Sequence, residues 1–359
     1  MRWRPRSPVR RRRKRHGSGP QADPQHLPHH RRRDLAADPA EDARWLAAAA
    51  GLAERGRPLS RPNPAVGAII VRDRIVVGRG WTGRGGRPHA EAVALEQAGA
   101  AAHGATLYVT LEPCAHTSPR GPACADLVAA AGLARVIAGV ADPDPRTAGA
   151  GLARLRGAGI AAECADDPAA RASLSGYLAR AERGRPHVTL KLATSLDGCI
   201  ALASGESRWI TGPAARAHAH RERARADAIL VGGGTLRTDR PVLDVRLAGL
   251  EDRSPRRLVL TRGAAPAGWT ALSDPAAIAT LDDVQYLLIE GGSDAAAAFL
   301  AAGLVDRLLL YRAPVLIGGG LPALGDLGLA SLADAKRGWR LADRRHFAPD
   351  TLEIFQRAR

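Results

Sequence analysis

The chain has 359 residues, of which 45% are hydrophobic and 25% are charged, a composition typical of a soluble globular protein. A prior of roughly 100–200 residues per domain predicts two domains. No apolar run approaches the ~18 residues of a membrane span, and no apolar segment of the kind found in secretory signals follows the basic N-terminal residues. We therefore expect a cytoplasmic protein that does not enter a membrane.

The net charge of +16 is concentrated at the start of the chain. Residues 1–33 contain twelve Arg or Lys and one acidic residue, which gives +11, whereas residues 34–359 carry only +5. The composition of residues 1–37 is that of a disordered basic tail, which would bind nucleic acid or an anionic membrane through charge alone. The alternative is that these residues correspond to an untranslated upstream stretch that was included in the predicted gene. Outside this tail we expect no contact with nucleic acid.

Folded sequence is expected to begin at Asp38, where an N-cap acid is followed by a proline at the first helical position and by Glu41 at the capping-box position. A helix should run from there to about Arg55. Two apolar runs at 65–71 and 75–80 predict a hairpin. Helices at 89–98 and 124–131 then alternate with strands at 106–111 and 134–140. This alternation predicts a three-layer α/β/α domain over residues 38–185.

A second domain is expected over residues 186–359. Apolar runs predict strands at 187–193, 228–231, 257–261, 286–289 and 307–311, with helices at 213–225 and 293–302 between them. The segment 143–185 joins the two halves and contains helical and strand-like pieces. The whole chain is thus predicted to be α/β.

One group of residues in the first half is typical of a zinc site. His89 lies 25 residues before Cys114, and nine residues separate Cys114 from Cys124. One imidazole and two thiolates leave the fourth tetrahedral position of Zn²⁺ open for water, as a catalytic site requires. Zinc lowers the pKa of that water toward about 7 and so supplies hydroxide, while Glu91 stands near the metal and can carry protons. The pattern partly matches the H-x-E and P-C-x-x-C signature of zinc nucleobase deaminases, since nine residues rather than two separate the cysteines.

Taken together, the motifs of this half resemble those of the bifunctional diaminohydroxyphosphoribosylaminopyrimidine deaminase/reductase family of riboflavin biosynthesis. The matching stretches are Asn63-Pro64-Ala65-Val66-Gly67, Pro88-His89-Ala90-Glu91, Thr110-Leu111-Glu112-Pro113-Cys114 and Cys124-Ala125-Asp126. The resemblance implies a cytidine-deaminase-like fold and a pyrimidine contact from Asn63, whose alternative role is to make a turn. His116 is either a solvent-facing loop residue or a substrate contact. Cys164 and Cys199 are expected to be small core residues.

The second half resembles the reductase part of the same family, whose fold is similar to dihydrofolate reductase. The matching stretches are 191–198, 204–211, 234–241, Glu290-Gly291-Gly292 and 313–320, together with Leu243 and Arg246. The resemblance implies that the NADPH site is formed by Ala193, Trp209, Thr235, Asp239 and Gly292. It likewise implies that substrate is held by Ser207, Arg223, Leu243, Arg246 and Glu290.

Several of these residues have a physical rationale of their own. Backbone amides at a glycine-containing helix start, as at Gly292, can receive a phosphate, and Arg223 and Arg246 can form forked hydrogen bonds to the substrate phosphate. Lys191 lies either beside the substrate or at a strand edge. Thr261-Arg262 replaces the Asp-Ser usual in the family, and we hypothesise that Arg262 meets the 2′-phosphate of NADPH.

The resemblance implies two sequential reactions on one small molecule. Zinc-bound hydroxide deaminates diaminohydroxyphosphoribosylaminopyrimidine, and NADPH then reduces the ribosyl group of 5-amino-6-(5-phosphoribosylamino)uracil to ribityl. We expect a homo-oligomer. One alternative is a polynucleotide base deaminase that holds RNA or DNA with the basic tail, which leaves the reductase-like half without a role. The other is a non-catalytic scaffold stabilised by zinc, which the open fourth position of the metal argues against.

Overall fold

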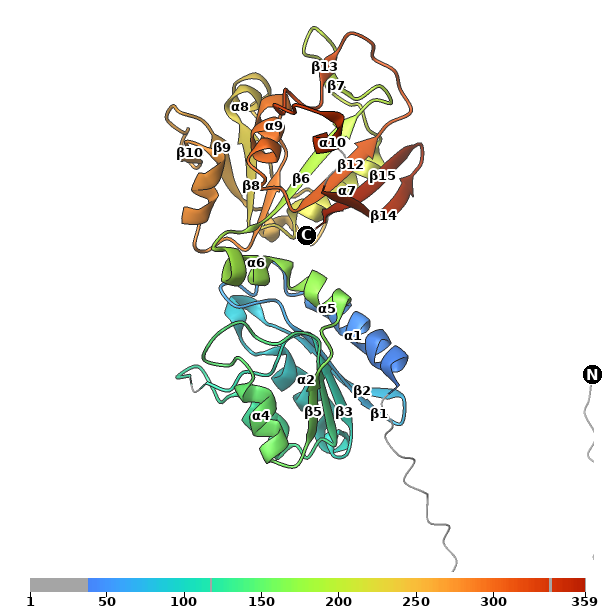
Figure 1. Ribbon diagram of the computed structural model, residues 1–359, viewed down its shortest axis with the longest axis vertical. Coiled ribbons are helices and arrows are strands. Elements are labelled where there is room, and N and C mark those ends of the chain that lie inside the picture. Colours follow the sequence, from blue (N-terminus) through green and yellow to red (C-terminus); the bar gives the residue numbers. More distant parts are fainter. Residues whose placement is uncertain (1–37, 117, 336–337, 359) are drawn as a thin grey trace, which may run out of the picture. The chain divides into compact units, whose positions relative to one another are not determined.

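The structure is a computed structural model that describes residues 38–116, 118–335 and 338–358 (Figure 1). The predicted basic tail, residues 1–37, lies outside the described residues. The remainder contains two separate β-sheets with helices packed on them, and a small third sheet of two strands. Among the described helices none is both long and apolar enough to cross a membrane.

The first sheet has five strands in the order β2-β1-β3-β4-β5. They are β1 (Gly67–Arg72), β2 (Ile75–Trp81), β3 (Thr106–Val109), β4 (Arg135–Ala138) and β5 (Ala161–Cys164). Strand β1 runs antiparallel to both β2 and β3, whereas β3, β4 and β5 are parallel. The predicted hairpin at residues 65–80 is confirmed, since β1 and β2 pair around the Arg72–Ile75 turn.

Helices cover both faces of this sheet. Helices α1 (Pro39–Ala53) and α5 (Pro168–Ser173) lie side by side on one face (Figure 1), and α2 (Ala90–Ala98), α3 (Cys124–Ala130) and α4 (Ala150–Gly157) pack on the other. Successive side chains of a strand point to opposite faces, so Ala68 and Ile70 join the core under α2 while Ile69 and Val71 join the core under α1. The predicted three-layer α/β/α arrangement is confirmed.

The second sheet has eight strands in the order β10-β9-β8-β11-β6-β12-β15-β14. Six of them run parallel, and β15 and β14 complete the sheet as antiparallel strands. Their bounds are β6 (His187–Thr194), β8 (Ala228–Gly232), β9 (Arg256–Leu260), β10 (Thr270–Leu272), β11 (Tyr286–Ile289), β12 (Arg307–Arg312), β14 (Trp339–Phe347) and β15 (Asp350–Arg357).

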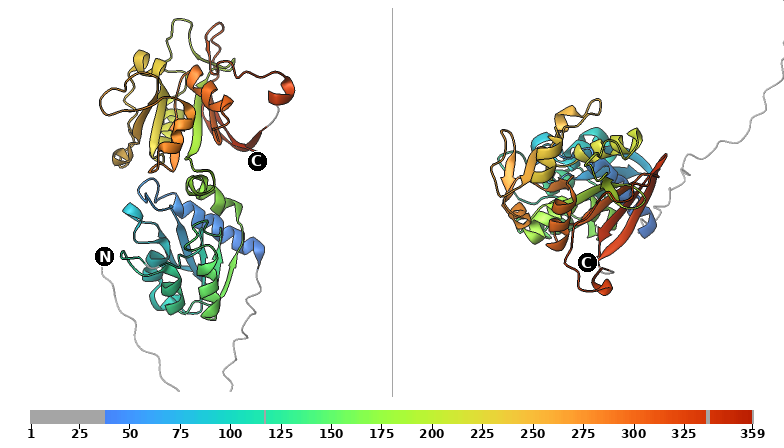
Figure 2. Two further views of the ribbon diagram at one scale, coloured as in Figure 1. Left: turned by 60° about the vertical axis from the view of Figure 1, so that its left-hand side comes forward. Right: turned by 90° about the horizontal axis from the view of Figure 1, so that it is seen from above.

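Helix α6 (Ser175–Arg183) belongs to the first half, where Leu178 enters the core. The helices of the second half are α7 (Pro213–Arg223), α8 (Gly233–Asp239), α9 (Ser293–Ala301) and α10 (Leu332–Ala335). Figure 2 shows the orange helix α9 against the strands of the sheet, where Phe299 and Ala296 enter the core. Strands β7 (Cys199–Ala201) and β13 (Leu321–Pro322) form the small third sheet. Because β8, β11 and β6 are parallel neighbours, the loops at their carboxyl ends meet along one edge, where ligands of such sheets usually bind.

The predictions for the two cysteines outside the zinc motif have different outcomes. Cys199 is buried, as expected, but Cys164 is exposed, so its prediction as a core residue is wrong. Cys164 ends β5, the edge strand of the first sheet, where only one of its four residues is buried. Because most of this edge strand faces solvent, the side chain at its end has no core to pack into.

Gly80 sets the distance between α2 and the sheet. A Cβ at this position would lie less than 3.0 Å from Ala90 O, Val93 Cβ and Ala94 N. We expect Gly80→Ala to lower the free energy of unfolding by about 1–3 kcal/mol through overpacking, measured by denaturant unfolding. Gly51→Ala is the matched control, because no atom lies within 4 Å of its added Cβ. That variant should be neutral or more stable by up to about 1 kcal/mol, and equal losses in both variants would contradict the steric explanation.

Candidate metal centre and reductase site

The three predicted zinc ligands come from two helix starts and one loop. His89 is the N-cap residue of α2 with an extended backbone, and Cys124 is the first residue of α3. Cys114 lies in the loop that follows β3. The start of α3 binds this loop, because Ala125 N donates to Cys114 O over 3.1 Å and Cys124 N donates to Cys114 Sγ over 3.3 Å. Backbone groups that a helix start leaves unpaired therefore hold one ligand next to another.

The donor atoms of these side chains converge. His89 Nδ1 lies 3.1 Å from Cys124 Sγ and 3.6 Å from Cys114 Sγ, and all three donor atoms lie within 4.8 Å of one another. Ligands of tetrahedral zinc, with Zn–N near 2.0–2.1 Å and Zn–S near 2.3 Å, are separated by about 3.5 Å from nitrogen to sulfur. The residues therefore fit Zn²⁺ in both chemistry and spacing.

The two thiols behave as a hydrogen-bonded pair. The hydrogen bond from Cys124, together with that from His89, lowers the pKa of the Cys114 thiol. The same hydrogen bond and burial raise the pKa of Cys124. Binding of zinc by both cysteines as thiolates requires the release of their protons.

Glu91 lies in the first turn of α2, two residues after His89, and only 4% of it is exposed. Burial raises the pKa of its carboxyl group, and its side chain reaches Cys124 by a hydrogen bond. A carboxyl group next to the metal ligands and outside the converging set of three donors is suited to proton transfer.

Asn63 lies beside this centre, and His116 follows Cys114 by two residues. Asn63 Nδ2 lies 3.1 Å from Gly86 O and 3.3 Å from His89 Nε2. The structure therefore brings Asn63 to the metal ligands, which a turn residue alone would not require. His116 Nδ1 lies 3.4 Å from the buried Thr147 Oγ1.

Sequence reasoning did not assign a role to Glu112. Its buried carboxylate accepts backbone N–H groups from Asp142 (3.2 Å), Gly149 (3.0 Å) and Leu152 (3.1 Å). It therefore holds the segment that contains Thr147 against the strand end that carries Cys114. The signal available in the sequence was an acidic residue between a predicted strand and a zinc ligand.

Two of the predicted substrate residues of the second half, Arg223 and Glu290, form a buried ionic cluster with Lys191. Glu290 directly follows β11. Arg223 donates to Glu290 from Nε (2.7 Å) and Nη2 (2.9 Å), and to Asp244 O from Nη1 (3.0 Å). Lys191 Nζ lies 3.8 Å from Glu290. Although burial opposes ionisation, Lys191 and Arg223 lower the pKa of Glu290 to about 2, so the carboxylate is charged at neutral pH.

Arg246 lies beside this cluster. It contacts His220 through its backbone N (3.2 Å) and Nη2 (3.3 Å), and Asp244 through Nη1 (3.7 Å). Its side chain is 58% exposed, compared with 14% for Arg223. Of the two predicted phosphate-binding arginines, Arg246 is thus the more accessible, while the donors of Arg223 are engaged within the protein.

Three of the predicted cofactor residues, Ala193, Thr235 and Gly292, lie at or just after the carboxyl ends of the neighbouring strands β6, β8 and β11. Gly292 is the N-cap of α9, and its N–H donates to Thr235 Oγ1 over 3.1 Å. Ala193 lies near the end of β6. Trp209 is 64% exposed, and the neighbouring Arg208 donates to Asp239 O over 3.1 Å.

The remaining two substrate candidates differ in exposure. Ser207 is partly exposed and precedes Arg208 in the same loop. Leu243 is only 5% exposed and packs with Ile229 and Val231, at a left-handed φ of 57°. We therefore expect any substrate contact of Leu243 to come from its main chain.

The two halves thus define a zinc-dependent deaminase fold followed by a nucleotide-dependent reductase fold. Residues 39–140 match the family model of the cytidine and deoxycytidylate deaminase zinc-binding region, and residues 186–352 match that of the RibD C-terminal domain. The chain is 39% identical to the riboflavin biosynthesis protein RibD of Escherichia coli K12, over 86% of this chain and 98% of that protein.

Solved structures agree with this assignment. A RibD structure from Acinetobacter baumannii is 34% identical with a TM-score of 0.78, and covers 90% of this chain and 100% of that one. A diaminohydroxyphosphoribosylaminopyrimidine deaminase/5-amino-6-(5-phosphoribosylamino)uracil reductase from Thermotoga maritima is 28% identical with a TM-score of 0.78, over 89% and 99% of the two chains. The chain belongs to the RibD family, and is a bifunctional deaminase and reductase of riboflavin biosynthesis that uses zinc and NADPH.

Removal of one thiolate should abolish the metal centre. We expect Cys124→Ala to lower bound zinc from about one per chain to below about one tenth at micromolar zinc, because two donors remain, with metal content measured by atomic absorption. Cys164→Ala is the matched control, since this exposed cysteine lies outside the converging donors. Full zinc occupancy in Cys124→Ala would refute the proposed ligand set.

Proposed function

We propose that the first half, residues 38–185, deaminates diaminohydroxyphosphoribosylaminopyrimidine, and that the second half, residues 186–359, reduces 5-amino-6-(5-phosphoribosylamino)uracil. The observation that carries the proposal is the convergence of His89, Cys114 and Cys124 within 4.8 Å, next to the buried Glu91. Three donors suit a catalytic rather than a structural zinc site. The relatives that match both halves support the pairing with a reductase.

In the deaminase half, the chain's own residues orient substrate and move protons. Zinc held by the three ligands supplies a Lewis acid that activates water at neutral pH. Glu91 accepts a proton from the attacking water and delivers it to the amino group, so that a C–O bond forms as the C–N bond breaks and ammonia leaves. Asn63 holds the pyrimidine at the edge of the site.

In the reductase half, bound NADPH would supply a hydride to the ribosyl carbon. The ring C–O bond at that carbon breaks, and its oxygen takes a proton from water, which gives the ribityl chain. The substrate's phosphate is bound by Arg246, whose guanidinium is accessible. Glu290 and Arg223, with Ser207 and the main chain of Leu243, line the substrate side. Charge pairing with Arg223 and Lys191 keeps Glu290 ionised and fixed in place. The cofactor side is formed by Ala193, Trp209, Thr235, Asp239 and Gly292.

Two further parts of the proposal concern the oligomeric state and the cellular location of the protein. Strand β14 is a nine-residue edge strand with seven exposed residues, and an open edge of this length is a template for pairing, which supports a homo-oligomer. The free cysteines of the described chain are typical of a reducing compartment, which supports a cytoplasmic location.

The decisive test follows both chemical signals in one protein. With the diaminopyrimidine ribotide in a single-turnover assay, wild type should release ammonia and then oxidise NADPH. Glu91→Gln should slow ammonia release by at least about 100-fold, the scale of general acid–base catalysis, while it still binds zinc and still reduces the deaminated intermediate. If zinc-loaded wild type gives neither signal, the assigned substrate is wrong.

Arg262 provides a test of cofactor selection. It is exposed and follows β9, two residues after Leu260. If it binds the 2′-phosphate, Arg262→Ala should lower the preference for NADPH over NADH by about ten- to a hundredfold, the scale of a hydrogen bond to a charged group, measured as the ratio of kcat/KM values. Arg344→Ala, in the exposed strand β14, is the control. An unchanged ratio in Arg262→Ala would count against this role.

A further inference from the structure

The loop that leads from α1 to Asn63 lies between α1 and β1 and is not part of a strand. Pro58, Pro62 and Pro64 lie in or next to it, and proline has no N–H to donate to a neighbouring strand. Local turns are present, since Ser60 N donates to Gly56 O and Asn63 N donates to Ser60 O. These turns shape the loop, and Gly85 N attaches it to its own half by donating to Leu59 O over 2.8 Å.

Three contacts with the reductase half attach the loop at further points. They come from Asp227, Gln285 and Tyr286, which we call the reductase platform. The carboxylate of Asp227, 2% exposed, accepts the backbone N–H groups of Gln285 and Tyr286 over 2.8 Å each. The platform is therefore a fixed unit at the amino ends of β8 and β11.

Each platform residue contacts a different point of the loop. Gln285 Nε2 donates to Pro62 O over 2.9 Å, and Asp227 Oδ1 lies 2.9 Å from Arg61 Nε. The ring centroid of Tyr286 lies 3.3 Å from the guanidinium carbon of Arg57, a cation–π contact.

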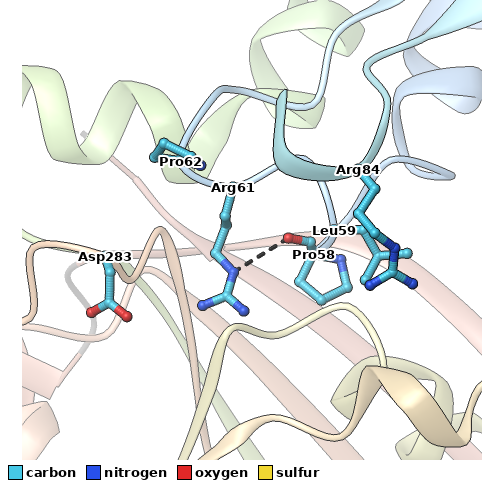
Figure 3. A pocket seen from close by; sticks show the side chains of 6 residues that line it. All are labelled: Pro58, Leu59, Arg61, Pro62, Arg84 and Asp283. Carbon is cyan, nitrogen blue, oxygen red and sulfur yellow. Dashed lines mark hydrogen bonds between the residues drawn. The ribbon is translucent and has the colours of Figure 1, made fainter. Parts of the chain in front are cut away.

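Arg61 is also bound within the loop. Figure 3 shows Arg61 with Pro58 and Pro62 beside an open cavity of about 350 Å³, where Arg61 Nε also donates to Pro58 O over 3.3 Å. Arg61 therefore links the fold of the loop to its attachment on the platform.

We propose that the reductase platform positions Asn63 in the deaminase site, so that pyrimidine binding in the first half depends on side chains of the second half. The inference rests on the proposed contact between Asn63 and substrate. Pro62 O, which Gln285 holds, belongs to the residue directly before Asn63. At its other end, the Asn63 amide is bound to Gly86 O and faces His89.

The alternative is that the platform contacts only join the two halves and do not position Asn63. The chain has a contact that suits that description better, namely the ion pair of Arg84 with Asp252 at 2.8 Å, whose side chains are 67% and 59% exposed. Exposed pairs of this kind contribute little. The platform differs because its contacts are mostly buried and each of its three residues reaches the loop that carries Asn63. Tyr286 Oη also donates to Ser173 O of α5 over 2.9 Å.

The test uses full-length, zinc-loaded protein and the diaminopyrimidine ribotide. Gln285→Leu keeps the size of the side chain but removes the donor to Pro62 O. We expect its KM for ammonia release to rise about threefold to tenfold, as for the loss of one hydrogen bond. The kcat, the zinc content and the rate of NADPH oxidation with the deaminated intermediate should stay within about twofold of wild type. The reason is that the lost interaction stabilises the bound substrate and the transition state equally. Arg61→Met, which removes the partner of Asp227, should show the same pattern. Asp252→Asn is the matched control and should leave KM unchanged.

Two results would overturn the proposal. One is an unchanged KM for ammonia release in both Gln285→Leu and Arg61→Met. The other is a fall in kcat of both reactions together with a lower melting temperature, which indicates a purely structural role. If wild type itself releases no ammonia, the proposed substrate fails instead, and the two failures are therefore distinguishable.

Discussion

The deaminase half depends on the attachment of one loop to one helix start. The first N–H groups of α3 have no partners within their helix, and two of them bind Cys114, at its carbonyl oxygen and at its sulfur. This fixes Cys114 beside Cys124, and the packing of α2 brings His89 to both thiols. The buried carboxylate of Glu112 holds the other side of the same loop. Zinc therefore meets ligands that the fold has already brought together.

The sequence allowed the zinc ligands and the layer order to be predicted because both leave local patterns. His89, Glu91 and the cysteines stand at element boundaries, where a short motif identifies the residue and its position on a helix or loop. Strand β1 also alternates between two cores in the expected period of two. Cys164 was predicted wrongly, because its environment depends on which strand lies at the sheet edge, and that order is set by distant segments.

The reductase residues show a second limit of sequence reasoning. Arg223 and Arg246 carry the same chemical group and were predicted to bind the same phosphate. They differ in exposure because of Glu290, which is 67 residues away from Arg223 in the sequence. Glu290 accepts two hydrogen bonds from the Arg223 guanidinium. A buried arginine with a charged partner costs less than one without, so the fold engages Arg223 internally and leaves Arg246 accessible. Motif spacing contains no information on this long-range pairing.

Strand β11 connects the two sites in a specific way. Gln285 lies just before it and Glu290 just after it, and all four of its residues are buried. At about 3.3 Å per residue, it is a short and fully packed spacer. Coupling between sites requires an element that can adopt two arrangements. A buried central strand that is bound on both sides by parallel neighbours has a single arrangement. The same strand can therefore fix the Asn63 loop at one end and the carboxylate of Glu290 at the other, without transmitting the occupancy of one site to the other. We therefore expect the platform to act only by positioning Asn63.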